Sequence, residues 1–551
     1  MNVVDDPLAA ERGRESERAA TRAAACFLAI ALPWVSSFSG GPSAQVVPWL
    51  VSLFAAAVLC AAGGMRRLPA SVLAAAAALV GWGAVRGHGG LDFFALAGSV
   101  GLVLLSATAG ASLATREDGL RTIAWALVAS AAVNAVIGLA QHQGFLQEGN
   151  AWLSAGSPGE AEGNLRQRNL LASHLSLGMI ALAWLFARGL RTAVALPLVL
   201  LLAVASAAST SRTGLLQLAL LAGFSMALPG PRRSQRIALC LLGLAAYALA
   251  MFGLPWLLEL RGIDAVNLFG RTSSVPLCSS RRTLWSNVLS LVTQKPWLGW
   301  GWGELDYAHY QVLFDGTRFC DILDNAHNLP LHVAVELGVP AAALVVLGIG
   351  AAVWRARPWR EVDGDRRFAW AVLAALALHS LVEYPLWYGT FQSAAGIALG
   401  ILCARGLPAL QAATRWAWTA AVLVLACYAS WDFWRVGQIY LPAEARSPAY
   451  AENTIARIGH SWVYRDQVRF ATLTLSTLTP DNATQVNALA REMLHFSPEP
   501  RVIEKVIESA KLLGREDEVA QEKRRYQAAF PKAYARWQLE QGAAAAPQAA
   551  R

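Results

Sequence analysis

A polar stretch at about residues 254–338 interrupts an otherwise apolar chain and carries the residues best suited to chemistry. It contains the run 324–328 (DNAHN), after which the sequence is apolar again. A histidine can take a proton from a hydroxyl near neutral pH, so His327 is the candidate catalytic base. The alternative is a histidine at a helix start that bonds only to loop backbone. His332, one helical turn later, could share the same site.

Arginines that border apolar runs form the second group of candidates. Gln167 and Arg168 lie in the run 163–169 (GNLRQRN), Arg212 lies in the run 209–214 (STSRTG), and Arg281 and Arg282 precede a Trp- and Gly-rich segment. Guanidinium groups match phosphate oxygens in shape and charge, which predicts a site for a phosphate-bearing substrate. Snorkelling arginines, structural ion pairs or a polar helix start would leave the same residues in the sequence.

Two carboxylates accompany these cations. Glu336 lies in the apolar stretch after the histidine, and Glu383-Tyr384 closes a later one. A carboxylate within a membrane span is costly unless it is paired, so Glu336 is expected to support the site through an ion pair with one of the arginines above. Glu383 and Tyr384 are expected to support it too, or to form an interfacial turn. The tryptophans of residues 297–302 are more typical of interface anchors than of sugar platforms.

Composition indicates where this chemistry takes place. The chain is 55% hydrophobic and 15% charged, whereas a soluble domain has about 25% charged residues. Since a spanning helix needs about 20 mostly apolar residues, we predict an all-α polytopic membrane protein with about 12 to 13 transmembrane helices. The net charge of +9 is spread over short loops and does not indicate nucleic-acid binding. The candidate spans are residues 23–39, 45–63, 69–86, 92–113, 122–140, 169–187, 192–210, 213–229, 237–256, 328–353, 368–384, 389–404 and 416–434.

The orientation follows from the positive charge of the connecting loops. With the N-terminus in the cytoplasm, every inner loop carries arginine, for example at residues 66–67, 188–191, 232–236 and 355–367. An odd number of spans then places the C-terminal part outside. All the candidate site residues fall at the outer face in this topology, together with Arg86, Arg166 and Arg271.

The change in composition along the chain predicts a domain organisation. After the last span, charged residues are frequent and apolar ones recur at helical spacing, which predicts about five amphipathic helices in a TPR-like domain. The predicted parts are a cytoplasmic tail (1–22), nine spans (23–256), a periplasmic active-site loop (257–327), four spans (328–434), a periplasmic α-helical domain (435–541) and a disordered tail (542–551).

Cysteine and histidine spacing predicts neither a metal site nor a cofactor. Of the seven cysteines, only Cys278 and Cys320 lie in the polar loop. They could form a disulfide if that loop faces an oxidising compartment, although spacing along the chain does not establish that they meet.

The order of these motifs resembles the O-antigen ligase/polymerase (Wzy/WaaL) superfamily of bacterial inner-membrane glycan transferases, and within it the PglL-type protein O-oligosaccharyltransferases. Arg168 stands where that family commonly has proline, and the loop has its own local form. The matching segments are residues 167–169 (QRN), 211–214 (SRTG), 282–299, 327–338, 383–386 (EYPL), 495–500 (HFSPEP), 513–516 (LGRE) and 529–531 (AFP).

The resemblance implies a reaction. The donor would be a glycan on undecaprenyl pyrophosphate, moved en bloc to a Ser or Thr hydroxyl of a pilin-like or other periplasmic protein, without a metal. His327 would activate that hydroxyl or stabilise the departing pyrophosphate. Arg212 and Arg282, with Arg281, Arg168 and Gln167, would bind the pyrophosphate. Such an enzyme works mainly by positioning its substrates and neutralising charge.

Alternative functions differ in acceptor or in class. Lipid A-core would be the acceptor in an O-antigen ligase, and a growing glycan in a Wzy-type polymerase. A transporter of lipid-linked glycans would place its polar residues near the bilayer midplane on broken helices, whereas here they gather at one predicted face. A membrane scaffold would not need the clustered arginines and the histidine.

Overall fold

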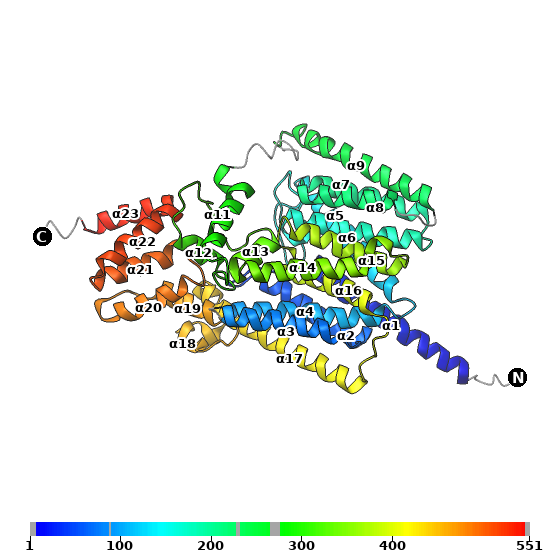
Figure 1. The fold of residues 1–551 in the computed structure, drawn as a ribbon, viewed down its shortest axis with the longest axis horizontal. Helices are drawn as coiled ribbons and strands as arrows, with labels where there is room; N and C mark the ends of the chain where they lie inside the picture. Colours follow the sequence, from blue (N-terminus) through cyan, green and yellow to red (C-terminus); the bar gives the residue numbers. More distant parts are fainter. Residues whose placement is uncertain (1–6, 88–89, 228–231, 265–275, 546–551) are drawn as a thin grey trace. The chain divides into compact units, whose positions relative to one another are not determined.

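The computed structural model describes residues 7–87, 90–227, 232–264 and 276–545 of the 551-residue chain. Every regular element in these ranges is a helix, apart from an isolated bridge between Arg66 and Ala409 (Figure 1). The predicted all-α fold class is confirmed. The chain divides into two compact units. Unit 1 comprises Met1–Ala76, Gly98–Ser274 and Val353–Ser430, and unit 2 comprises Ala77–Ala97, Val275–Ala352 and Trp431–Arg551.

The α-helices follow one another along the chain, and the connections between α5 and α6 and between α12 and α13 are long. Those of the first half are α1 (Pro7–Val35), α2 (Val46–Gly63), α3 (Ala70–Arg86), α4 (Gly90–Leu113), α5 (Gly119–His142), α6 (Arg168–Ala187), α7 (Thr192–Ala208), α8 (Arg212–Ala227) and α9 (Arg233–Glu259). The later ones are α11 (Arg281–Gln294), α12 (Leu305–Gln311), α13 (Leu329–Leu337), α14 (Val339–Ala356), α15 (Gly364–Ser380), α16 (Gly389–Cys403), α17 (Ala412–Gly437), α18 (Thr454–Ile458), α19 (Arg465–Leu475), α20 (Ala483–Met493), α21 (Pro500–Leu512), α22 (Glu516–Ala529) and α23 (Pro531–Ala545).

Eight of the described helices are long and apolar enough to cross a membrane, namely α1, α2, α4, α5, α6, α9, α14 and α17. Three shorter apolar helices, α3, α7 and α16, also coincide with predicted spans. The predicted spans 213–229 and 368–384 correspond to α8 and α15, which have 16 and 17 residues. The chain is therefore a multi-pass membrane protein, and length and composition select eight of the described helices, fewer than the 12 to 13 predicted. Of the predicted disordered tail, residues 542–545 belong to α23 and 546–551 lie outside the described residues.

One predicted span is wrong in form. Residues 328–353 are not one helix, because α13 ends before Gly338 and α14 begins after it. Gly338 has φ +94°, and a Cβ there would lie 2.2 Å from the carbonyl oxygen of Trp297, so only glycine fits this approach of two backbones. As a result Glu336 lies on α13, outside the apolar span Val339–Arg360.

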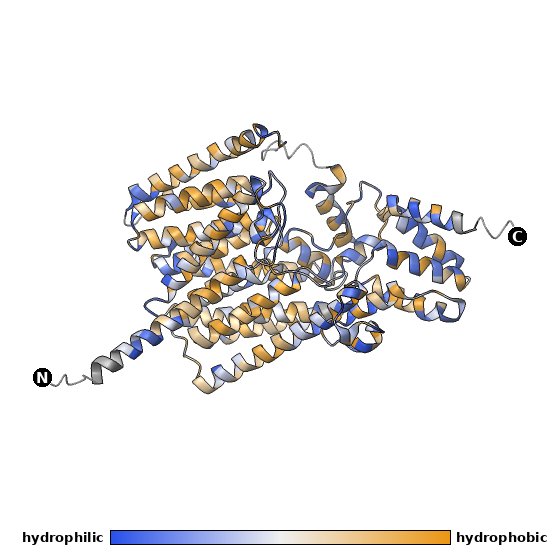
Figure 2. Cartoon of the chain, turned by 180° about the vertical axis from the view of Figure 1, so that it is seen from behind, coloured by the Kyte–Doolittle hydropathy of each residue, from blue (hydrophilic) through white to orange (hydrophobic). Residues whose placement is uncertain are grey.

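Helices of unit 1 pack around an apolar core, and Figure 2 shows that hydrophobic residues predominate along them. Where α4 meets α16, small residues let the backbones touch. A Cβ on Gly396 would lie 2.4 Å from the Val103 carbonyl oxygen, and one on Gly400 would lie 2.2 Å from that of Ala107. Close contact through small residues is typical of membrane helices, because lipid gives no hydrophobic drive for their association.

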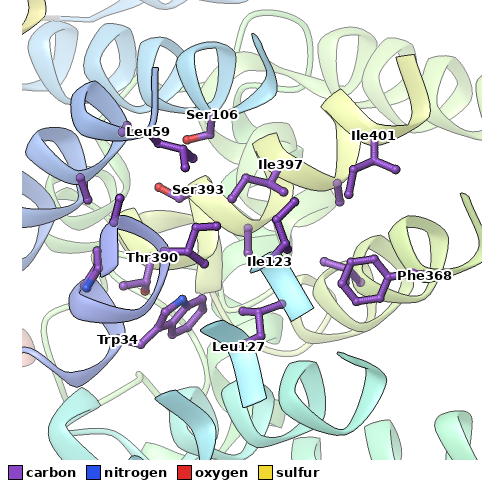
Figure 3. A pocket seen from close by; sticks show the side chains of 18 residues that line it. Trp34, Leu59, Ser106, Ile123, Leu127, Phe368, Thr390, Ser393, Ile397 and Ile401 are labelled. Atoms are coloured by element: carbon purple, nitrogen blue, oxygen red, sulfur yellow. The ribbon is translucent and has the colours of Figure 1, made fainter. Parts of the chain in front are cut away.

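An apolar cavity of about 30 Å³ lies among α1, α2, α5, α15 and α16. Figure 3 shows Trp34, Leu127 and Ile397 facing it, with the hydroxyls of Thr390 and Ser393 nearby. None of the side chains that line this cavity is charged, so it offers no cationic group to bind a pyrophosphate.

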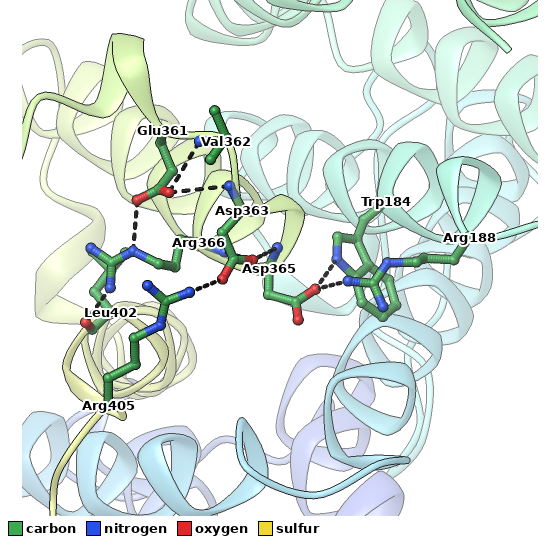
Figure 4. A network of polar contacts seen from close by, with 9 residues as sticks. All are labelled: Trp184, Arg188, Glu361, Val362, Asp363, Asp365, Arg366, Leu402 and Arg405. Atoms are coloured by element: carbon green, nitrogen blue, oxygen red, sulfur yellow. Dashed lines mark hydrogen bonds and ion pairs between the residues drawn. The ribbon is translucent and has the colours of Figure 1, made fainter. Parts of the chain in front are cut away.

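A network of ion pairs joins α6, α15 and α16 at one end of the unit 1 helices (Figure 4). Asp365, near the start of α15, accepts hydrogen bonds from Trp184 Nε1 at 3.0 Å and from the Arg188 guanidinium beyond the end of α6. Arg405 pairs with Asp363 at 2.5 Å. This basic end includes arginines that the sequence analysis places in cytoplasmic loops. The polar starts of α6 and α8 lie at the opposite ends of their helices.

In unit 2, the five helices α19–α23 pack on one another through amphipathic faces. Buried residues of α21 recur at helical spacing, as expected for a helix with one apolar face. The side chain of Tyr310 from α12 is part of the same apolar cluster. The buried apolar residues of α21 are Val502, Ile503, Val506, Ile507 and Ala510, and Ser509 is buried beside them.

Candidate active site

The start of α6 places the first group of predicted residues, in unit 1. Gln167 caps the helix, and its Oε1 accepts a hydrogen bond from the backbone N–H of Leu170 at 2.7 Å. The amide oxygen of Gln167 is therefore used to cap the helix, as expected for a polar helix start and not for a substrate ligand. Arg168 at the first helical position lies 3.8 Å from Glu160, and both side chains are partly exposed. The Arg168 guanidinium thus remains accessible to solvent and to an anionic ligand.

Asn169 joins three motifs that are far apart in the sequence. Its Nδ2 donates to Glu383 Oε1 at 3.2 Å, and its Oδ1 accepts from Ser211 Oγ at 2.7 Å. Glu383 and Ser211 are both buried. The structure thereby brings the predicted segments 167–169, 211–214 and 383–386 to one place in unit 1, with Glu383 acting as an acceptor in a side-chain network.

The start of α8 places Arg212 beside this network. Ser211 Oγ accepts the backbone N–H of Gly214 at 3.0 Å, which closes the first turn of the helix. A Cβ on Gly214 would lie 2.6 Å from the Cβ of Ala172, so α8 packs tightly on α6 at this point. The Arg212 side chain is exposed. A guanidinium at the start of a helix, where backbone N–H groups also point outward, suits an anion.

Further polar groups continue into the helices of unit 1. Ser173 Oγ lies 2.7 Å from His379 Nδ1 and 3.0 Å from Gln217 Oε1, and Gln217 Nε2 donates to the Ala375 carbonyl oxygen at 2.9 Å. These buried bonds hold α6, α8 and α15 in register below the Asn169 network. Tyr384 stacks on Tyr388 with ring centroids 6.1 Å apart.

The second group of predicted residues belongs to unit 2. Cys278 and Cys320 form a disulfide with a Cα–Cα distance of 5.3 Å. Two residues further on, Ser280 caps α11 by accepting the N–H of Thr283 at 3.2 Å. Arg281 and Arg282 are the first residues of this helix, and Arg282 is exposed. Two positive side chains oppose the helix dipole there, so a bound anion would relieve their repulsion. Arg271 lies outside the described residues.

His327 occupies a tightly held turn before α13. Its φ is +49°, a left-handed conformation that non-glycine residues rarely adopt. Its backbone N–H donates to Asn325 Oδ1 at 2.8 Å, and the next residue, Asn328, caps α13 by accepting the N–H of Leu331 at 2.9 Å. The His327 side chain is partly exposed. It can therefore meet a substrate while its backbone is fixed.

Trp285 links this turn to α11. Its Nε1 donates to the carbonyl oxygen of Ala326, the residue before His327, at 3.0 Å. Trp285 lies one turn along α11 from Arg281 and Arg282. The predicted base and two predicted pyrophosphate ligands are therefore carried by one hydrogen-bonded scaffold in unit 2.

Glu336 is buried on α13, with 2% of its side chain exposed. Its Oε2 accepts the N–H of Gly303 at 3.1 Å and lies 3.4 Å from His332 Nε2. Burial raises the pKa of Glu336 well above its usual range, against the effect of the Gly303 hydrogen bond. The expected pairing with arginine is replaced by pairing with a histidine and a backbone amide.

The Trp- and Gly-rich run packs along α13. The N–H groups of Trp300 and Gly301 donate to the carbonyl oxygens of Val335 and Glu336, both at 2.9 Å. Trp300 also donates its Nε1 to Leu291 at 3.0 Å, whereas the Trp297 ring is 75% exposed. Trp300 and Trp302 are thus partly buried against the unit 2 core, whereas Trp297 is exposed. The remaining outward arginine of this region, Arg86, reaches the Gly299 carbonyl oxygen at 3.4 Å.

The structure also shows polar groups that the sequence analysis missed. Tyr310 donates its hydroxyl to Glu522 of α22 at 2.6 Å, and His495 pairs with Glu304 at 2.6 Å while its ring stacks on Tyr307. These bonds attach α12 to the C-terminal helices. The paired residues are 212 and 191 positions apart in the sequence, so no local pattern could have indicated these bonds. Among the described residues, no group of three or more His, Cys, Asp and Glu could hold a metal ion.

The fold is that of a multi-pass membrane protein, with exposed guanidinium groups at helix starts and a partly exposed imidazole in the turn before α13. Sequence comparison shows which families the chain resembles. Residues 197–346 match the family described as O-Antigen ligase, residues 161–186 match Protein glycosylation ligase, and residues 367–544 match Virulence factor membrane-bound polymerase, C-terminal. Three separate segments of the chain are therefore similar to O-antigen ligases, protein glycosylation ligases and membrane-bound polymerases, and the resemblance of its motifs is confirmed.

Two curated relatives come from Acinetobacter baylyi (strain ATCC 33305 / BD413 / ADP1). The "General O-oligosaccharyltransferase" is 24% identical over 223 residues, which cover 38% of this chain and 37% of the relative. The "ComP-specific O-oligosaccharyltransferase" is 25% identical over 137 residues, which cover 25% of this chain and 24% of the relative. The matches thus span about a third and a quarter of these relatives' lengths.

Proposed function

We propose that the protein transfers an oligosaccharide en bloc from undecaprenyl pyrophosphate to a Ser or Thr hydroxyl of a periplasmic or pilin-like protein, without a metal. The observation that carries this proposal is the scaffold in unit 2. The hydrogen bond from Trp285 to Ala326 ties the His327 turn to α11, whose first residues are Arg281 and Arg282. A base and two phosphate-binding groups on one rigid support match the needs of this transfer.

In the proposed reaction the acceptor hydroxyl oxygen attacks the anomeric carbon of the glycan. The bond from that carbon to the pyrophosphate oxygen breaks, and its electron pair leaves with the pyrophosphate. His327 takes the hydroxyl proton as the new bond forms. Arg282, Arg281 and Arg212 stabilise the negative charge that grows on the leaving group, and Arg168 adds to the positive field. Gln167, Glu383, Tyr384 and Glu336 hold the helix starts that carry these groups.

The proposed orientation places the N-terminus in the cytoplasm and the C-terminal helices in the periplasm of a bacterial inner membrane. The arginine-rich end of unit 1 in Figure 4 fits a cytoplasmic face, because positive loops remain inside. The disulfide between Cys278 and Cys320 fits an oxidising compartment for the polar loop.

The proposed function differs from that of an O-antigen ligase and from that of a Wzy-type polymerase only in the acceptor of the glycan. The names of the two curated relatives, both O-oligosaccharyltransferases, favour a protein acceptor. The family matches to O-Antigen ligase and to a membrane-bound polymerase leave lipid A-core and a growing glycan as the alternative acceptors.

The test uses the purified full chain in nanodiscs with an undecaprenyl-pyrophosphate oligosaccharide, a chelator, and three acceptors: a pilin, lipid A-core and free glycan. We expect glycan on the pilin. His327→Ala should lower the rate by about 10²- to 10⁴-fold, the usual contribution of a general base. Arg282→Ala should lose more activity than Arg282→Lys, because lysine keeps the charge. His460→Ala, at an exposed histidine of unit 2, is the matched control.

Each other outcome has a distinct meaning. Glycan on lipid A-core or a lengthened glycan would replace the acceptor and leave the chemistry in place. Full activity of His327→Ala would refute the mechanism. No transfer to any acceptor, combined with movement of the lipid-linked glycan across vesicle membranes, would show a transporter.

A further inference from the structure

His332 lies one turn into α13, and only 3% of its side chain is exposed. Its two ring nitrogens have different partners. Nδ1 lies 3.4 Å from the backbone nitrogen of Ala326, and Nε2 lies 3.4 Å from Glu336 Oε2. A backbone N–H can only donate, so Nδ1 accepts and the ring proton sits on Nε2, from which it donates to Glu336. This arrangement requires a neutral imidazole.

The surroundings keep the ring neutral and fix its direction. Burial, together with the nearby His327, lowers the pKa of His332 to about 3. Glu336 Oε2 also accepts the Gly303 N–H at 3.1 Å, so the carboxyl group is held from a second side. A histidine whose far nitrogen is bonded to a fixed carboxyl group presents its near nitrogen in a defined orientation.

The backbone of Ala326 is therefore held on both sides. His332 accepts its N–H, and Trp285 donates to its carbonyl oxygen at 3.0 Å. The next residue, His327, has φ +49°, a conformation that costs about 1–3 kcal/mol for a non-glycine residue unless the surrounding structure imposes it. The two bonds to Ala326 supply that restraint immediately before the strained residue.

We propose that His332 is a positioning residue for the transfer reaction: its neutral ring, anchored on Glu336, holds the Ala326 backbone so that His327 is presented to the acceptor hydroxyl. This inference rests on the proposed role of His327. His332 itself is buried and bonded through both nitrogens, so it does not serve as the base.

Three substitutions separate positioning from packing. In His332→Asn, the side-chain oxygen takes the place of Nδ1 and can still accept from Ala326, but the side chain no longer reaches Glu336. In His332→Gln, the amide nitrogen takes the place of Nε2 and can still donate to Glu336, but the acceptor for Ala326 is lost. His332→Leu keeps an apolar volume and loses both bonds. His460→Leu is the exposed control.

The assay is the transfer reaction described above, with kcat and the KM for the lipid-linked donor measured separately, and with the thermal unfolding midpoint recorded for each variant. A misplacement of about 1 Å lowers a rate by about 10²-fold. We expect His332→Leu and His332→Gln to lose about that much in kcat with little change in KM. His332→Asn should recover at least about 10-fold of this loss.

The remaining outcomes distinguish this inference from the one on which it rests. Full activity of His327→Ala would remove the proposed function, whatever the His332 variants do. An inactive His327→Ala beside a fully active, equally stable His332→Leu would refute the positioning role alone. Equal losses in the Asn, Gln and Leu variants, in proportion to their fall in unfolding midpoint, would show that His332 acts only through packing.

Discussion

Acid should loosen α12 through His309, a buried histidine outside the candidate site. Only 3% of its side chain is exposed. Its Nδ1 lies 3.3 Å from Arg318 Nη2, and its Nε2 lies 3.2 Å from Asn287 Oδ1. Since a guanidinium only donates, Nδ1 accepts and Nε2 carries the proton that is donated to Asn287. Burial, with the charge of Arg318, lowers the pKa of His309 to about 2.

The size of the stability loss follows from the different proton binding of His309 in the folded and open states. An unfolded histidine titrates near pH 6.5, so the open state binds a proton below that pH and the folded state does not. Stability is therefore present above pH 6.5 and is lost as the pH falls. Between pH 7 and pH 5 the loss is about 2 kcal/mol, equivalent to about 25-fold more frequent opening.

Hydrogen exchange measures this opening locally. Asp306 on the same helix is also buried, and burial raises its pKa well above its usual range, so it titrates in the opposite sense. The contribution of His309 is therefore measured against His309→Gln, which can still donate to Asn287 but does not titrate. We expect the ratio of α12 amide exchange rates at pH 5 and pH 7, after correction for the intrinsic rates, to be about 25-fold larger in the wild type than in this variant. The exposed-site variant His460→Gln should behave as the wild type. The same ratio in the wild type and in His309→Gln would refute the reasoning.

Three further predictions concern the stability of unit 2. Tyr310→Phe should destabilise the contact between α12 and α22 by about 1.5–3 kcal/mol, because the Glu522 carboxylate loses a buried donor; exchange of α22 amides measures it. Gly299→Ala should cost more than about 3 kcal/mol, since its Cβ would lie 2.3 Å from a backbone carbonyl oxygen of α13, whereas Gly316→Ala meets nothing within 4 Å and should leave the unfolding midpoint unchanged. Cys278→Ser opens a disulfide that spans 42 residues and should cost about 4 kcal/mol, seen as a lower midpoint that matches the reduced wild type.

Hydropathy and helical periodicity were sufficient to predict the helices. Each predicted span coincides with a helix, because an apolar run of that length has few other ways to satisfy its backbone in lipid. The exception is the break at Gly338. This break depends on the close approach of the Trp297 backbone, which is a tertiary contact. The hydropathy of the sequence does not change at a break of one residue, so it could not indicate where the helix ends.

The sequence was sufficient to predict which motifs belong to the candidate site, but not which hydrogen bonds join them. The motifs around Gln167, Ser211 and Glu383 are recognisable separately, and the structure joins three of them through Asn169. A hydrogen bond over 214 residues of sequence leaves no local signal. His332 did have a signal, since it lies one turn after the Asn328 cap, but its two partners come from other segments.

The structure further divides the predicted residues by how their polar atoms are used. Gln167 caps a helix, and Glu383 and Glu336 are buried acceptors in bonded networks. In contrast, Arg212 and Arg282 are exposed at helix starts. A buried, bonded group cannot reach a substrate without breaking its own contacts, whereas an exposed guanidinium at a helix start gains by binding an anion.

This division predicts different kinetic effects for the two sets. Removing an exposed arginine should weaken pyrophosphate binding or the stabilisation of its leaving charge and leave the fold intact. Removing a buried acceptor such as Glu383 should first lower stability, and activity only as far as α6 and α8 shift. Glu383→Gln keeps the size of the side chain and an oxygen that can accept from Asn169, so it should retain far more transfer activity than Arg282→Ala. Comparable losses in these two variants, at unchanged unfolding midpoints, would instead place Glu383 in direct contact with the substrate.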